Sequence, residues 1–101
     1  MDIKLEGRQV DIGADLHERI HSRFAGLDKR FGPITYARVS IEKKPHLNEG
    51  RAEVKMVANV TGSTITATRD ADTVMQAVND ALDTLTEELT AHVEKKKKNH
   101  R

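Results

Sequence analysis

Apolar and polar side chains alternate through AEVKMVANVTGSTITAT, residues 52–68 of the chain. Such a period of two is typical of β-strands with one buried face. The Thr61-Gly62 pair in the middle has the composition of a hairpin turn. The apolar face would carry Ala52, Val54, Met56, Ala58, Val60, Ile65 and Ala67. We therefore expect two neighbouring strands joined by a tight turn.

Two earlier segments repeat the alternation. Ile3 and Leu5 alternate with charged residues up to Gly7, and Val39 and Ile41 lie in a similar pattern that ends near Pro45. These segments predict a first strand that ends at Gly7 and a second strand that begins near Ala37 and ends near Pro45. The sheet would then have four strands, each with one apolar and one polar face.

Two further segments have the period of a helix, with apolar residues spaced by three and four. The first, bounded by Asp11 or Asp15 at its start and by Gly32-Pro33 at its end, carries Ile12, Leu16, Ile20, Phe24, Leu27 and Phe31. The second, capped by Asp72 or Thr73, carries Val74, Val78, Ala81, Leu82, Leu85, Leu89 and Val93. Acidic and hydroxyl side chains are favoured at helix starts because they accept hydrogen bonds from free backbone N–H groups.

The predicted order is β-α-β-β-β-α, an α+β fold. Both helices would cover one face of the four-stranded sheet and leave the other face open. With 101 residues the chain has room for one core. We expect a single domain over residues 1–94 and a basic C-terminal tail over residues 95–101.

Composition excludes several classes of function. The chain has no cysteine, which rules out disulfides and thiolate chemistry. No Gly-rich phosphate loop occurs, and none of the serines lies in a nucleophile-elbow pattern. The N-terminus lacks the apolar region of a secretory signal, and no apolar run approaches the ~20 residues of a membrane span. We expect a cytoplasmic protein that is no enzyme and has no cofactor, small-molecule substrate or membrane partner.

The run from His17 to His21 matches the HExxH pattern of zinc proteases. That chemistry needs a third metal ligand and a substrate cleft. No Gly-x-x-His continuation follows, and the adjacent helix face would be buried against the sheet. Two exposed helical histidines, with no metal site, are the prediction. His46 and His92 have no catalytic partner at a recognisable spacing and are expected to be loop and helix-end residues.

Basic residues gather in two places. On the first helix, Arg19, Arg23 and Arg30 form a row beside the apolar stripe, with Lys29 further round. Such a row suits phosphates, although the arginines could instead pair with Glu18, Asp28 or strand acids. In the second place, seven acidic residues without any Lys or Arg over residues 70–94 precede Lys95, Lys96, Lys97 and Lys98. This cationic tip would meet a polyanion such as nucleic acid, or be only a solvated, frayed end.

The combination resembles the ribosome hibernation-promoting factors and ribosome-associated inhibitors, once called sigma-54 modulation proteins. The likeness covers nearly the whole chain through order and spacing. It is carried by IKLEG at residues 3–7 with VDI at 10–12, RFAGLDKRF at 23–31, VSIEK at 39–43, and Ala77, Val78, Leu82, Asp83, Leu85, Leu89 and His92.

The resemblance implies a domain similar in shape to double-stranded-RNA-binding folds. It also implies a translation repressor that binds the small ribosomal subunit and its 16S-type rRNA, with a helper factor as a further partner for ribosome dimerisation. The implied RNA-binding residues are Arg23, Lys29 and lysines 95–98, with Arg19 and Arg30 added by proximity. The second helix departs from the family, because Thr84, Glu87, Glu88 and Ala91 stand where basic residues are usual. Either only its tip touches RNA, or ribosome affinity is altered.

A second function class stays open from the sequence. A protein-interaction module of the same fold, with weak or no ribosome binding, would use the acidic face of the second helix or the open sheet face. The polar residues expected on that sheet face include Arg38, Ser40, Glu53, Lys55, Thr64 and Thr66.

Overall fold

The computed structural model describes residues 2–43, 51–60 and 62–98, the last four by their backbone alone. The elements are β1 (Asp2–Arg8), α1 (Ala14–Phe31), β2 (Ile34–Lys43), β3 (Ala52–Val60), β4 (Ser63–Ala71) and α2 (Val74–Lys98). This is the predicted order of strands and helices. His46 lies outside the described residues.

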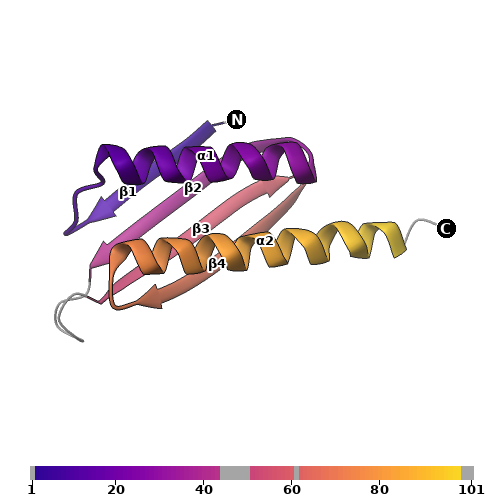
Figure 1. Cartoon of the computed structure of the whole chain (residues 1–101). Helices are drawn as coiled ribbons and strands as arrows, with labels where there is room; N and C mark the ends of the chain where they lie inside the picture. The colour runs from indigo at the N-terminus through magenta and orange to yellow at the C-terminus, as the bar shows by residue number, and fades with distance from the viewer. Residues whose placement is uncertain (1, 44–50, 61, 99–101) are drawn as a thin grey trace.

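The four strands form one mixed sheet in the order β1-β2-β3-β4. β1 and β2 are parallel, while β2–β3 and β3–β4 are antiparallel. Figure 1 shows α1 and α2 on the same side of this sheet. The expectation of one covered and one open face is therefore confirmed.

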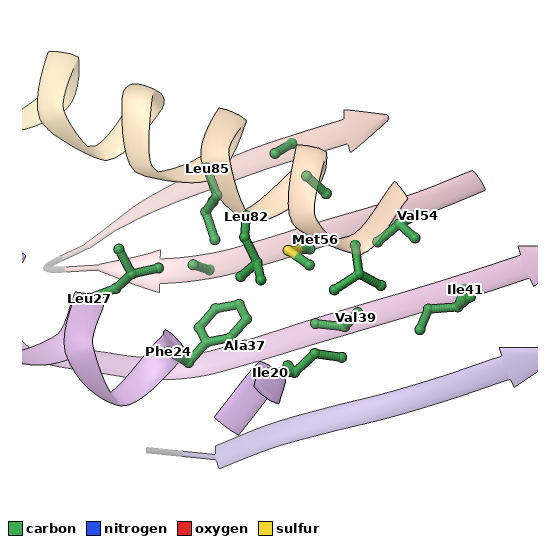
Figure 2. Close-up of a cluster of buried hydrophobic side chains, with 14 of the residues drawn as sticks. Ile20, Phe24, Leu27, Ala37, Val39, Ile41, Val54, Met56, Leu82 and Leu85 are labelled. Carbon is green, nitrogen blue, oxygen red and sulfur yellow. The ribbon is translucent and has the colours of Figure 1, made fainter. Parts of the chain in front are cut away.

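The core lies between the sheet and the two helices. Ile20 and Phe24 of α1 and Leu82 and Leu85 of α2 are all fully buried. Figure 2 shows them pointing toward Val39, Met56 and other apolar side chains of the central strands. No polar or charged residue in the described part of the chain is buried. Packing of aliphatic side chains, not a buried polar network, holds the layers together.

The two helix starts differ from each other. At α2 the backbone N–H of Gln76 donates to Oγ1 of Thr73 at 3.1 Å, so Thr73 is the cap of the two expected candidates. At α1 the cap residue is Gly13, with no side-chain hydrogen bond, so the expected cap at Asp11 or Asp15 is wrong. Asp15 lies in the first turn, where its charge favours the positive end of the helix dipole.

α1 ends at the expected place. Gly32 has a φ of 99°, a backbone conformation that residues with a Cβ rarely adopt. Just before it, Oδ1 of Asp28 accepts the backbone N–H of Ile34 at 2.7 Å. The carboxylate thereby joins the last turn of α1 to the first residue of β2.

The two helices run in the same direction. Arg19 contacts Asn79 and Arg23 contacts Asp83, each pair 60 residues apart in the chain. At this register, Phe31 at the end of α1 lies level with Ala91. The rest of α2, residues 92–98, extends beyond α1 by about 10 Å at 1.5 Å per residue. Figure 1 shows this projection, which we call the helix overhang.

Gly26 offers a direct test of α1. It lies inside the helix, and a Cβ added there would meet nothing within 4 Å. Gly26→Ala is expected to stabilise the protein by about 0.5–1 kcal/mol, because alanine loses less backbone entropy on entering a helix. Urea denaturation measures the change. A destabilised variant would mean that the open space beside Gly26 is filled in solution.

Candidate nucleic-acid interface

The predicted arginines lie on the flank of α1 that faces α2, and we call Arg19, Arg23 and Arg30 the arginine row. Nε of Arg19 donates to Oδ1 of Asn79 at 2.7 Å. Nη2 of Arg23 donates to Oδ1 of Asp83 at 3.5 Å. The first two arginines are thus partnered across the helix pair, by α2 residues in place of the expected Glu18, Asp28 or strand acids.

The C-terminal half of the arginine row has a different setting. Cζ of Arg30 lies 4.8 Å from the centroid of the Phe31 ring, a cation–π distance that leaves the N–H donors available. Lys29 is exposed one residue earlier. Within the described residues neither side chain has an ion pair. The helix register places Thr86 and Thr90, not acids, opposite this half of α1.

The two threonines of α2 do not compete for Arg30. The hydroxyl of Thr86 donates to the backbone oxygen of Leu82, and that of Thr90 donates to the backbone oxygen of Thr86, both at 2.8 Å. Each threonine is therefore bonded to its own helix. Arg19 and Arg23 therefore have hydrogen-bond partners on α2, whereas Arg30 has no ion pair among the described residues.

The helix overhang carries residues 95–98, the lysine cluster. The backbone of all four lysines is helical, and α2 continues to Lys98. Positive charge at the C-terminal end of a helix is favourable because the backbone dipole is negative there. α1 ends at the same side of the molecule (Figure 1). Lys29, Arg30 and the lysine cluster therefore share one end of the domain, which we call the basic end.

The outer surface of α2 has the opposite charge. Glu87, Glu88 and Glu94 are exposed, and Asp80 accepts a hydrogen bond from Nε2 of Gln76 at 2.8 Å within the same helix. A phosphate backbone lying along this surface would meet carboxylates within the ~8–10 Å range of unscreened repulsion. The outer surface of α2 therefore opposes a phosphate backbone.

The open sheet face carries internally paired charges. Nη2 of Arg38 donates to both carboxylate oxygens of Glu6 at 2.9 Å, and Nζ of Lys4 lies 3.6 Å from Glu6. The hydrogen bond from Arg38 lowers the pKa of Glu6 below its usual range, and the same contact raises the pKa of Arg38. A shallow groove of about 310 Å³ includes Arg38, Ser40, Glu53 and Lys55 in its lining. This face has no excess of positive charge.

The histidines of the HExxH pattern lie on α1, away from the arginine row. Their rings are nearly parallel, with centroids 5.7 Å apart, and both residues are exposed as expected. Across the described residues no group of three or more His, Cys, Asp or Glu side chains could hold a metal ion. His92 is half-buried near the end of α2, and its Nε2 has no hydrogen-bond partner among the residues that the structure describes.

Sequence reasoning missed the residues that engage the arginine row. Asn79 and Asp83 are spaced by four, as Arg19 and Arg23 are, so each pair occupies one helix flank. This matched spacing is a signal for facing helix flanks. It could not identify the partners without the register of α1 on α2, which only the packed core determines.

The chain is thus a small α+β domain whose two parallel helices bring Lys29, Arg30 and the lysine cluster to one end. Residues 3–97 match the family described as sigma 54 modulation protein / S30EA ribosomal protein. The chain belongs to this family.

Relatives and solved structures agree with this assignment. Ribosome hibernation promoting factors of Salmonella typhimurium and Escherichia coli are each 27% identical over 99 residues, covering 96% of this chain and 98% of the relative. A ribosomal subunit interface protein from Coxiella burnetii has a TM-score of 0.76 at 21% identity, covering 93% of this chain and 99% of that structure. The N-terminal domain of Thermus thermophilus Protein Y has a TM-score of 0.79 at 20% identity, with 91% and 99% covered.

Neither helix in the described part of the chain is long and apolar enough to cross a membrane.

Proposed function

We propose that this protein is a hibernation factor that binds the small ribosomal subunit in the cytoplasm and represses translation reversibly. Membership of the family supports ribosome association, and the relatives in Salmonella typhimurium and Escherichia coli are named for promoting ribosome hibernation. The protein would act by occupying space on the ribosome. It would perform no chemical step and need no cofactor.

The observation that carries the proposal is the basic end. α1 and α2 run in parallel, so Lys29, Arg30 and the lysine cluster come to the same end of the domain. Clustered arginine and lysine side chains bind the phosphates of 16S-type rRNA through charge-assisted hydrogen bonds. Arg19 and Arg23 would contribute only where rRNA phosphates replace their α2 partners. The acidic outer surface of α2 faces away from the RNA in this arrangement.

The salt dependence of binding tests this proposal. If about five phosphates are neutralised, log affinity for purified small subunits should fall against log salt with a slope of about −3.5 to −4.5. Cosedimentation of the protein with small subunits over a series of salt concentrations measures the slope. A flat dependence would contradict binding through phosphates.

A protein-interaction module remains the second candidate because the open sheet face is grooved and carries the half-exposed Tyr36. Arg38 and Lys4 on this face are already paired with Glu6, which favours a neutral polar partner over a polyanion. Salt-insensitive binding to a protein without cosedimentation with ribosomes would support this function. A helper factor for ribosome dimerisation is the kind of partner that this face could accept.

A further inference from the structure

We propose that Asp83 is an internal competitor for the phosphate that Arg23 would bind, and that it limits the affinity of this protein for RNA. In the free protein the Asp83 carboxylate occupies the guanidinium of Arg23. On the ribosome an rRNA phosphate would take its place. This inference rests on the proposed function and names a residue that tunes it.

The Arg23–Asp83 contact is weak enough for a phosphate to replace the carboxylate. It is a single contact of 3.5 Å between Nη2 and Oδ1, and the two side chains are 37% and 67% exposed. Ion pairs of this kind contribute little to stability, in the range of about 0–1 kcal/mol. A phosphate can offer the guanidinium two shorter, charge-assisted hydrogen bonds. The exchange therefore favours phosphate once the RNA has been positioned by other contacts.

The position of Arg23 makes it the next contact along α1 after the basic end. Arg30 and Arg23 are two helical turns apart, about 10 Å. Between them is Gly26, where an added Cβ would meet nothing within 4 Å apart from its chain neighbours and the backbone of α1 itself, so a sugar-phosphate backbone could approach α1 closely. Arg19 is less suited to exchange, because its bond to Asn79 is short at 2.7 Å.

Asp83 opposes RNA in two ways. Its carboxylate occupies the donor of Arg23, and after displacement it stays close to the incoming phosphate. Asparagine has nearly the same shape as aspartate but has no charge. Asp83→Asn should therefore release Arg23 and remove the repulsion while leaving α2 intact.

The experiment compares Asp83→Asn with Glu87→Gln by cosedimentation with purified small ribosomal subunits. Glu87 is exposed one turn further along α2 and has no hydrogen bond or ion pair within the described residues, so its variant loses the same charge without touching Arg23. We expect Asp83→Asn to bind about 5- to 10-fold more tightly than the unmodified protein, and Glu87→Gln no more than about twofold. The salt slope of Asp83→Asn should steepen by about 0.7–0.9, because no displaced carboxylate then takes up a cation when the phosphate at Arg23 releases its own.

The same acid variants made together with Arg23→Gln separate the release of Arg23 from a general effect of net charge. With Arg23→Gln, the gain from Asp83→Asn should shrink to that of Glu87→Gln, because no guanidinium is left to release. Equal gains from the two acid variants in the presence of Arg23 would overturn the role of Asp83 while leaving the proposed function intact. Absence of binding by all variants and by the unmodified protein would overturn both. Thermal unfolding of each variant confirms that the compared proteins are folded.

Discussion

Changing all four residues of the lysine cluster to glutamine is expected to weaken binding to small ribosomal subunits by about 100-fold near 0.15 M salt. Each lost lysine removes a phosphate contact and the release of its counterion. The salt slope should fall in size by about 3, which leaves only the contacts of α1. Glutamine and lysine have similar helix propensities, so the helix overhang should persist. Cosedimentation over a salt series measures both quantities.

The matched control for this variant lies on the opposite face. Lys4 and Lys55 point from the open sheet face and are both exposed. The double variant Lys4→Gln/Lys55→Gln removes the same charge as Lys97→Gln/Lys98→Gln. Binding should be nearly unchanged in the first and weakened about tenfold in the second. Equal losses would show that net charge, not the basic end, determines affinity.

Phe24→Ala is expected to lower the free energy of unfolding by about 3–5 kcal/mol. The Phe24 ring is fully buried between α1 and the central strands (Figure 2), and its loss would leave a cavity that the small aliphatic residues around it cannot fill. A domain of this size has a total stability of about 5–15 kcal/mol, so the variant should lose a large fraction of it. Urea denaturation followed by circular dichroism gives the value.

The control for Phe24 is Tyr36, an aromatic residue on the open sheet face that is 39% exposed. Tyr36→Ala should cost clearly less, about 1–2 kcal/mol, because more than a third of its surface stays in water and its loss opens no closed cavity. Similar losses for the two variants would mean that the covered face is not the dominant core. The comparison thus tests the arrangement of the layers as well as one side chain.

Most of the fold could be predicted from the sequence because each element has a clean period. The alternation through residues 52–60 coincides with β3, and the helical spacing ends at Gly32 as predicted. The extension of β4 beyond Thr68, to Ala71, was not predicted, because Arg69 and Asp70 do not continue the alternating apolar pattern. Both residues belong to the strand because they pair with Val54 and Glu53 of β3. Pairing of strands through backbone hydrogen bonds does not require an alternating pattern of apolar residues, so the hydropathy of the sequence does not reveal it.

The basic residues of the candidate site could be predicted from the sequence, but their hydrogen-bond and ion-pair partners could not. The arginine row followed from the helical wheel, and the lysine cluster from its charge. The partners of Arg19 and Arg23 depend on how far α1 slides along α2, which the burial of Phe24, Leu82 and Leu85 determines. The hydrogen bond from the backbone N–H of Ile34 to the Asp28 carboxylate likewise depends on the turn at Gly32. Contacts of this kind arise only once the core has packed.

The helix overhang also has a geometric consequence. A lone α-helix is about 10–12 Å across with its side chains, much thinner than a sheet covered by two helices. The final turns of α2 are therefore narrow enough to enter a crevice that excludes the rest of the domain. Inserting four residues before the lysine cluster would lengthen this reach by about 6 Å and rotate the charges only slightly. The number of residues by which α2 extends beyond α1 therefore determines how far the helix can reach into a crevice, whatever the charges at its tip.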